Sequence, residues 1–198
     1  MEYIKNYFSE VSKIAELIDK DKISKIIIKL QKIKKNKGRL FFLGVGGGAA
    51  NASHAVNDFR KICGFEAYTP LDNISELSAR VNDEGWESIF VNWLKGSQLC
   101  EKDGVFIFSV GGGNKEKNIS TNLVEALKYA KKARAKIFGI VGRDGGYTAK
   151  VADVCIIIPP VNSETITPHT ESFQAVVWHL IVSHPEIKES EMKWESIK

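Results

Sequence analysis

His54 and Asp58 have the residue types and the spacing of a site that binds a divalent metal or moves protons. They are four positions apart, so on a helix both side chains project from one face and can share a ligand. Imidazoles combined with carboxylates suit zinc or a similar divalent ion. Taken singly, each residue is more often an ordinary polar residue of a helix surface, and that alternative stays open at this point.

A second pair, Glu171 and His179, lies near the end of the sequence. The segment 165–168 predicts a helix start, with Thr167 as the N-cap and Pro168 at the first helical position. Glu171 then belongs to the first turn, and His179 follows about two turns later. This pair offers the same ligand types as His54 and Asp58.

Two glycine-rich loops each follow an apolar run and lead into a predicted helix. They read Leu43-Gly44-Val45-Gly46-Gly47-Gly48 and Phe108-Ser109-Val110-Gly111-Gly112-Gly113-Asn114. Such loops expose backbone N–H groups to an anion, so the pair favours a phosphorylated ligand over the alternative of tight turns alone. A dinucleotide fingerprint fits poorly, because the GxGxxG pattern that starts at Gly44 has Ala49 in its last position.

Composition and charge are those of a single globular domain. The chain has 198 residues, of which 43% are hydrophobic and 26% charged, so disorder and coiled coil are excluded as overall descriptions. The net charge of +4 comes from the first 39 residues, and the remainder is nearly neutral. We therefore expect no nucleic-acid partner, since a binding groove needs clustered Lys and Arg.

Cysteine usage and hydropathy indicate a cytoplasmic protein. Cys63, Cys100 and Cys155 are an odd number without paired spacing, which predicts neither a disulfide framework nor a cysteine zinc site. The first residues lack the pattern of a secretory signal, and no apolar run approaches the roughly 20 residues that cross a bilayer. We expect no membrane association.

The pattern of apolar residues along the chain predicts a doubly wound α/β fold, whose elements must position these residues. Helical spacing of apolar residues marks two helices within residues 1–38. Residues 39–184 alternate between buried strands and helices, which is typical of a mostly parallel sheet in a flavodoxin-like fold. Residues 185–198 form a charged tail that we expect to be solvated. The predicted strands are 39–43, 104–108, 136–141 and 154–158, with 67–71 as a fifth, and the predicted helices after the opening pair are 49–63, 75–97, 117–134 and 168–183.

Three ordered motifs resemble the sugar isomerase (SIS) domain, specifically the phosphoheptose isomerases. They are residues 44–58, residues 71–85 with Asn82-Asp83-Glu84-Gly85, and the segment Val141-Gly142-Arg143-Asp144-Gly145-Gly146. The resemblance covers nearly the whole chain and implies one SIS domain over residues 1–198. It implies conversion of sedoheptulose 7-phosphate to a heptose 7-phosphate for bacterial surface polysaccharides, by a homotetramer with sites between subunits.

The resemblance also implies roles for individual residues. His54, Asp58, Glu171 and His179 fall at metal-binding positions, and Asp58 and His179 also at catalytic ones. Substrate contacts are implied for Val45, Gly46, Gly47, Asn82, Asp83 and Glu171, and for Ser109, Val110, Gly111 and Asn114 in the phosphate loop.

The chain departs from the family pattern in both glycine loops and at two of the metal-binding positions. The serine that closes the first glycine loop is Gly48 here, and the phosphate loop keeps one hydroxyl, on Ser109, where the family has four. The catalytic Glu is Asp58, and a Gln has become Glu171. We expect backbone N–H groups and the cations Lys115 and Lys117 to replace the lost hydroxyls.

An aldose–ketose isomerisation needs a base that removes a proton beside a carbonyl and an acid or metal that stabilises the developing oxyanion. Asp58 is the candidate base and His179 the candidate acid, while a metal held by His54, Glu171 and His179, zinc being favoured, would polarise the carbonyl. The alternative is a non-catalytic SIS module that binds a sugar phosphate, a nucleotide sugar or a protein partner.

Helix geometry separates Glu171 from His179. Eight residues on one helix place their Cα atoms roughly 12 Å apart and turn them by about 80° from each other. One metal with bonds of about 2 Å is hard to reach from both. We therefore predict that each site takes Glu171 from one chain and His179 from another, as in a symmetric oligomer.

Overall fold

The computed structural model describes residues 1–197 and contains a five-stranded, all-parallel sheet in the order β2-β1-β3-β4-β5. The order reverses between β1 and β3, as the flavodoxin-like prediction requires, and this switch point is where open α/β sheets bind ligands. The strands are β1 Leu40–Gly44, β2 Ala67–Tyr68, β3 Gly104–Ser109, β4 Lys136–Val141 and β5 Val154–Ile157.

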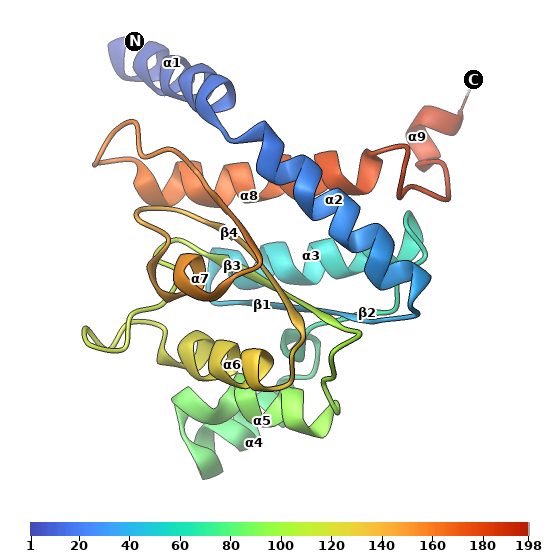
Figure 1. Cartoon of the computed structure of the whole chain (residues 1–198). Helices are drawn as coiled ribbons and strands as arrows, with labels where there is room; N and C mark the ends of the chain where they lie inside the picture. The colour runs from blue at the N-terminus through green and yellow to red at the C-terminus, as the bar shows by residue number, and fades with distance from the viewer. Residues whose placement is uncertain (198) are drawn as a thin grey trace.

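Helices cover both faces of the sheet (Figure 1). Helices α2, α3 and α8 lie on one face, and α5, α6 and α7 on the other, so each face has its own apolar core. The α-helices are α1 Glu2–Leu17, α2 Lys20–Lys35, α3 Gly47–Lys61, α4 Ile74–Glu84, α5 Ile89–Gly96, α6 Thr121–Lys132, α7 Gly146–Val151, α8 Ile166–Ser183 and α9 Lys193–Ser196, and the short 3₁₀ helices are η1 Pro70–Asp72 and η2 Trp86–Ser88.

The central strands are apolar throughout because both of their faces are buried. Phe42, Phe106 and Phe138 point to the core under α2, α3 and α8, and the rings of Phe42 and Phe106 stack at 5.1 Å. Phe41 and Ile107 point to the opposite core, under α5 and α6. The non-alternating runs in the sequence therefore predicted buried parallel strands correctly.

The single helix expected over residues 75–97 is wrong. Gly85 has a φ of +82°, a conformation that helices exclude, and it ends α4 before η2 and α5 begin.

The predicted helix 117–134 begins four residues later, at Thr121, because residues 114–119 close a loop through two backbone hydrogen bonds between Asn114 and Ile119. Helix α7 was not predicted.

Helix α8 also begins earlier than the sequence indicated. Its N-cap position is Thr165, not Thr167, so Pro168 is the third helical residue and Glu171 belongs to the second turn. The Thr165 hydroxyl donates to the carboxylate of Glu10, 2.8 Å away on α1. A contact with the N-terminal helix α1 thus helps to set where α8 starts.

The segment after α8 packs against the body instead of lying in solvent. Ile187 is buried, and the N–H groups of Glu189 and Ser190 both donate to the carbonyl of Ile62. Lys34 forms an ion pair with Glu189 at 2.6 Å. The prediction of a solvated tail is wrong here, and it holds for Trp194, which is 81% exposed. Residue 198 of the predicted tail lies outside the described residues.

Across residues 1–197, no helix combines the length and the apolar character that crossing a membrane requires.

Candidate active site

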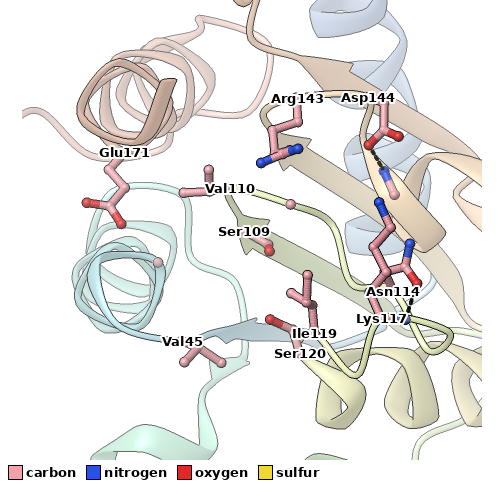
Figure 2. Close-up of a pocket in the computed structure, with 13 residues that line it drawn as sticks. Val45, Ser109, Val110, Asn114, Lys117, Ile119, Ser120, Arg143, Asp144 and Glu171 are labelled. Atoms are coloured by element: carbon pink, nitrogen blue, oxygen red, sulfur yellow. Dashed lines mark hydrogen bonds between the residues drawn. The ribbon is translucent and has the colours of Figure 1, made fainter. Parts of the chain in front are cut away.

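A pocket of about 420 Å³ opens at the carboxyl ends of β1, β3 and β4, beside the switch point of the sheet (Figure 2). The glycine loops after β1 and β3 form two of its walls, and α8 and the loop after β4 contribute further side chains. The residues that line it are Val45, Gly48, Ser109, Val110, Gly111, Asn114, Lys117, Ile119, Ser120, Arg143, Asp144, Gly146 and Glu171.

The first glycine loop brings the start of α3 against β3. Gly46, at the N-cap position, has a φ of +59°, which favours glycine. A Cβ at Gly48 would collide with the carbonyl oxygen of Phe108 on β3. Packing against β3 therefore explains why Gly48 stands where the family has a serine. A Cβ at Gly47 would collide with the carboxylate of Glu171, so this loop and α8 are in direct contact.

The second glycine loop is held by α7 and by the loop after β4 that leads into it. The N–H of Gly112 donates to the hydroxyl of Ser109 at 3.0 Å, and the carbonyl of Gly112 accepts from both the N–H and the hydroxyl of Thr148. A Cβ at Gly112 would meet the carbonyl of Gly145. Gly112 thus serves the packing of the loop, whereas Gly111 borders the pocket.

Residues 114–119 bring a cation and a second hydroxyl to the pocket. The side-chain oxygen of Asn114 accepts from the N–H of Lys117 at 3.0 Å, which fixes the loop before α6. Lys117 and Ser120 both line the pocket, whereas Lys115 turns away to Glu125, 3.3 Å distant. Of the two predicted cations, Lys117 lines the pocket and Lys115 does not, and Ser120 adds a hydroxyl from outside the second glycine loop.

Arg143 and Asp144 were not predicted as site residues. They follow β4, and Arg143 has a φ of +50°. Figure 2 shows Arg143 and Glu171 on either side of Val110, while Asp144 accepts a hydrogen bond from the N–H of Gly146. The sequence signal was available, because both residues lie in the segment 141–146 that carries the resemblance to the SIS domain.

His54, Asp58 and His179 form a second cluster, in which one ligand atom from each lies within 4.8 Å of the others. His54 and Asp58 come from α3 and His179 from α8. Asp58 Oδ2 is 3.8 Å from Nε2 of each imidazole. The other oxygen of Asp58 accepts from Asn57 at 2.7 Å, and Nδ1 of His179 is 2.8 Å from the carbonyl of Ala175.

This donor set fits a divalent metal. Two imidazole nitrogens and one carboxylate oxygen are ligands that zinc accepts. A tetrahedral ion with bonds of about 2.05 Å places its ligand atoms about 3.3 Å apart, so separations of 3.8 Å from Asp58 to each imidazole, and of at most 4.8 Å within the whole set, require the atoms to close by about 0.5 to 1.5 Å. The Nδ1 contact of His179 to a backbone carbonyl leaves Nε2 as the ligating atom, as is usual for metal-bound histidine.

Glu171 is not part of this cluster within one chain. It lines the pocket, and its backbone carbonyl accepts from Asn51 at 3.0 Å. Asn82 and Asp83 lie on α4, exposed to solvent and outside the pocket, where the Asn82 amide donates to Asp83. The structure therefore brings six of the predicted substrate residues into one pocket, with Gly46 and Gly47 beside it, and leaves Asn82 and Asp83 apart. The six are Val45, Ser109, Val110, Gly111, Asn114 and Glu171.

Known proteins similar in sequence to this chain include phosphoheptose isomerases. Phosphoheptose isomerase 2 of Campylobacter jejuni is 30% identical over 189 residues, covering 90% of this chain and 89% of that protein. The phosphoheptose isomerase of Sulfurimonas denitrificans is also 30% identical, over 91% of this chain and 90% of its own. The lincomycin biosynthesis protein LmbN of Streptomyces lincolnensis is 34% identical over 74% of this chain, and the match spans 56% of the length of LmbN.

Solved structures show the same fold. Phosphoheptose isomerase GmhA from Neisseria gonorrhoeae superimposes with a TM-score of 0.78 at 23% identity, over 91% of this chain and 95% of that one. The enzyme from Francisella tularensis has the same TM-score at 16% identity, over 91% and 92% of the two chains. No family model matches the chain. On the strength of its curated relatives, the chain belongs to the phosphoheptose isomerase family of sugar-phosphate isomerases.

Proposed function

We propose that this protein catalyses a metal-assisted aldose–ketose isomerisation of a sugar phosphate, with sedoheptulose 7-phosphate as substrate and a heptose 7-phosphate as product. The observation that carries the proposal is the convergence of His54, Asp58 and His179 on one point. The finer assignments are zinc as the metal, a cytoplasmic homotetramer as the active form, and lipopolysaccharide or capsule synthesis as the pathway.

The pocket supplies recognition of the phosphate. Lys117 and Arg143 bring positive charge to its wall, and Ser109, Gly111 and Ser120 add hydroxyl and backbone groups. Charge-assisted hydrogen bonds to an anion are stronger than those between neutral groups. Two cations therefore compensate for the hydroxyls that the second glycine loop lacks.

The cluster supplies the proton chemistry. Asp58 removes the proton from the carbon beside the carbonyl, and Asn57 holds its other oxygen so that Oδ2 stays directed at the imidazoles. His179 is the acid: Nε2 is the ring nitrogen that faces the cluster, because Nδ1 lies against the carbonyl of Ala175, and Nε2 returns a proton only while it does not ligate the ion. A bound divalent ion would supply positive charge that polarises the substrate carbonyl.

Shortening the catalytic Glu to Asp withdraws the carboxylate by about 1.5 Å, the length of a C–C bond, and such a displacement can cost on the order of a hundredfold in rate. In this chain Asp58 still lies 3.8 Å from both imidazoles, so the shorter side chain reaches the other members of the cluster. This distance supports Asp58 as the base.

The test is isomerisation of sedoheptulose 7-phosphate followed by NMR. Wild type should turn over, and Asp58→Asn should lose at least about a hundredfold in kcat because the amide cannot accept the proton. His184→Ala changes a histidine outside the cluster and should keep wild-type activity. Full activity in Asp58→Asn would refute the mechanism, and sugar-phosphate binding without turnover in the metal-loaded wild type would favour a non-catalytic binding module.

A further inference from the structure

Trp178 touches both histidines of the metal cluster. It precedes His179 on α8, and its side chain is fully buried in the core between α3, α8 and the sheet. Its ring centroid lies 4.7 Å from that of His54, in an edge-on arrangement, and 3.5 Å from that of His179. One rigid aromatic side chain therefore packs against two of the three ligand residues.

His54 depends on this packing more than the other two ligands do. Asp58 and His179 each have a hydrogen bond that fixes their orientation. The His54 side chain is 58% exposed, and within residues 1–197 no hydrogen bond to its ring is found. An exposed imidazole without such a contact samples several rotamers, and metal binding must then order it. The edge-on contact with Trp178 restricts the ring before any ion arrives.

The indole nitrogen takes no part in this arrangement. Trp178 Nε1 is buried and has no hydrogen-bond partner among the described residues. The ring consequently acts through its shape and its faces. A phenyl ring at position 178 should supply much of the same packing, whereas an aliphatic side chain should not.

We propose that Trp178 is a positioning residue that preorganises His54 and His179 for a divalent cation. The proposal rests on the metal role in the proposed function and adds a residue that carries no ligand atom. Residues that orient metal ligands typically contribute about 10- to 100-fold to metal affinity. Trp178 should act within that range on affinity, and it should also influence the geometry of the bound ion.

The test compares Co²⁺ binding to the metal-free variants Trp178→Leu and Trp178→Phe and to metal-free wild type, by calorimetry and by the visible absorption of the bound ion. Trp178→Leu should weaken binding by about 10- to 100-fold and alter the absorption bands, and Trp178→Phe should restore affinity to within a few fold. Phe138→Leu is the matched control, because Phe138 is fully buried in the same core and its aromatic contact is with Phe106 on the sheet.

Urea unfolding of all variants separates positioning from stability. Phe138→Leu should lose stability like Trp178→Leu but keep wild-type Co²⁺ affinity and absorption. If Trp178→Leu does not fold, Trp178→Met replaces it, since methionine fills core volume without an aromatic face. Wild-type affinity in the aliphatic variant, or an equal loss in Phe138→Leu, overturns the proposal.

Wild type is also assayed with sedoheptulose 7-phosphate. If wild type binds Co²⁺ but does not isomerise the sugar phosphate, the proposed function is contradicted. The Co²⁺ affinities of the Trp178 variants then still decide the role of Trp178. Failure of wild type to bind Co²⁺ overturns the role of Trp178 together with that of the metal.

Discussion

Among residues 1–197, Lys117 and Arg143 are the cations that line the pocket, while Lys115 is paired with Glu125. We predict that Lys117→Ala and Arg143→Ala each weaken sugar-phosphate binding roughly tenfold, because each removes a charged donor to the phosphate. The loss should shrink as salt rises, since salt screens the attraction. Isothermal calorimetry at two ionic strengths measures this effect.

Lys115→Ala is the matched control, because it removes the same charge from the same loop but from outside the pocket. The affinity of Lys115→Ala for the sugar phosphate should stay within about twofold of that of wild type, since a charge outside the pocket acts on the phosphate only at long range, where salt screens it. A loss equal to that of Lys117→Ala would show that the pocket does not hold the phosphate.

The cluster of His54, Asp58 and His179 predicts about one divalent ion per purified chain, which a strong chelator removes. Imidazole ligates only as the neutral ring, so metal content should fall as the pH drops below about 6. Elemental analysis after dialysis at several pH values checks both expectations. Chelated protein that isomerises sedoheptulose 7-phosphate at the full rate would exclude the metal role.

The three cysteines differ in burial, so we predict that they differ in reactivity. Burial raises the pKa of the Cys63 thiol to about 12 and that of Cys155 to about 11, whereas Cys100 is exposed. At pH 8, iodoacetamide should label Cys100 within minutes and the other two only after unfolding in urea, as mass spectrometry can measure. Rapid labelling of Cys63 in the folded protein would contradict its burial.

At the scale of elements, Asp103 joins the starts of two neighbouring strands. It is 1% exposed and accepts from the backbone of Arg39 at 2.9 Å, from the Arg39 guanidinium at 2.8 Å and from the N–H of Cys100 at 3.0 Å. Burial alone would raise the pKa of Asp103, but the hydrogen bonds from Arg39 and Cys100 outweigh it and hold the pKa below its usual range.

Because the pKa is lower in the folded state, Asp103 stabilises the fold above the pKa of the unfolded chain, near 4, and the contribution disappears as the pH falls through the folded value. Asp103→Asn should therefore cost about 2 kcal/mol at pH 7 and much less in acid. Urea unfolding at pH 7 and at pH 3 measures the difference. An equal cost at both values would assign the effect to something other than the carboxylate charge.

The sequence predicted those elements whose signals are local. The central strands follow from uniformly apolar runs, and α3 follows from the glycine loop before it. The start of α8 was misplaced because Thr167 and Pro168 imitate a helix start, while the actual start also involves Glu10 on α1. Helix α7 is only six residues long and begins at a glycine, so no apolar period marks it.

The site was predictable to the extent that its residues lie in motifs. His54 and Asp58 were singled out by their types and their spacing of four residues, and the resemblance implied metal-binding positions for them and for His179 and Glu171. Lys115 pairs with Glu125 and so points away from the pocket, whereas Lys117 lines it. The ion pair joins residues ten positions apart, and no spacing rule predicts such a pair from the sequence. Ser120 was missed because the loop of residues 114–119 separates it from the glycine run.

At the scale of the whole molecule, several exposed surfaces suit contact with further copies of the chain. Tyr3 and Phe8 on α1 and Ile74 on α4 are each at least 65% exposed, and α4 has no buried residue. Asn82 and Asp83 lie on α4, outside the pocket of their own chain, so a substrate contact from them requires a neighbouring copy. These features support the predicted oligomer with shared sites.

Mixing two inactive variants tests that prediction. Glu171→Ala and His179→Ala should each be inactive alone. When they are refolded together, about a quarter of the sites should receive the intact Glu from one variant and the intact His from the other, because assembly is random. Wild type refolded in parallel sets the full activity, and a tag on one variant verifies assembly. Mixed oligomers without activity would mean that no site is shared in this way.

The position of the metal cluster in the chain also determines when it can form. His54 and Asp58 lie on α3 and His179 on α8, and more than half the chain, including four of the five strands, lies between them. Contacts this distant in sequence form late in folding. A nascent chain that has not yet released α8 from the ribosome has no cluster, so the ion cannot nucleate the fold as zinc does in a zinc finger. Metal uptake during refolding therefore marks the docking of the last long helix.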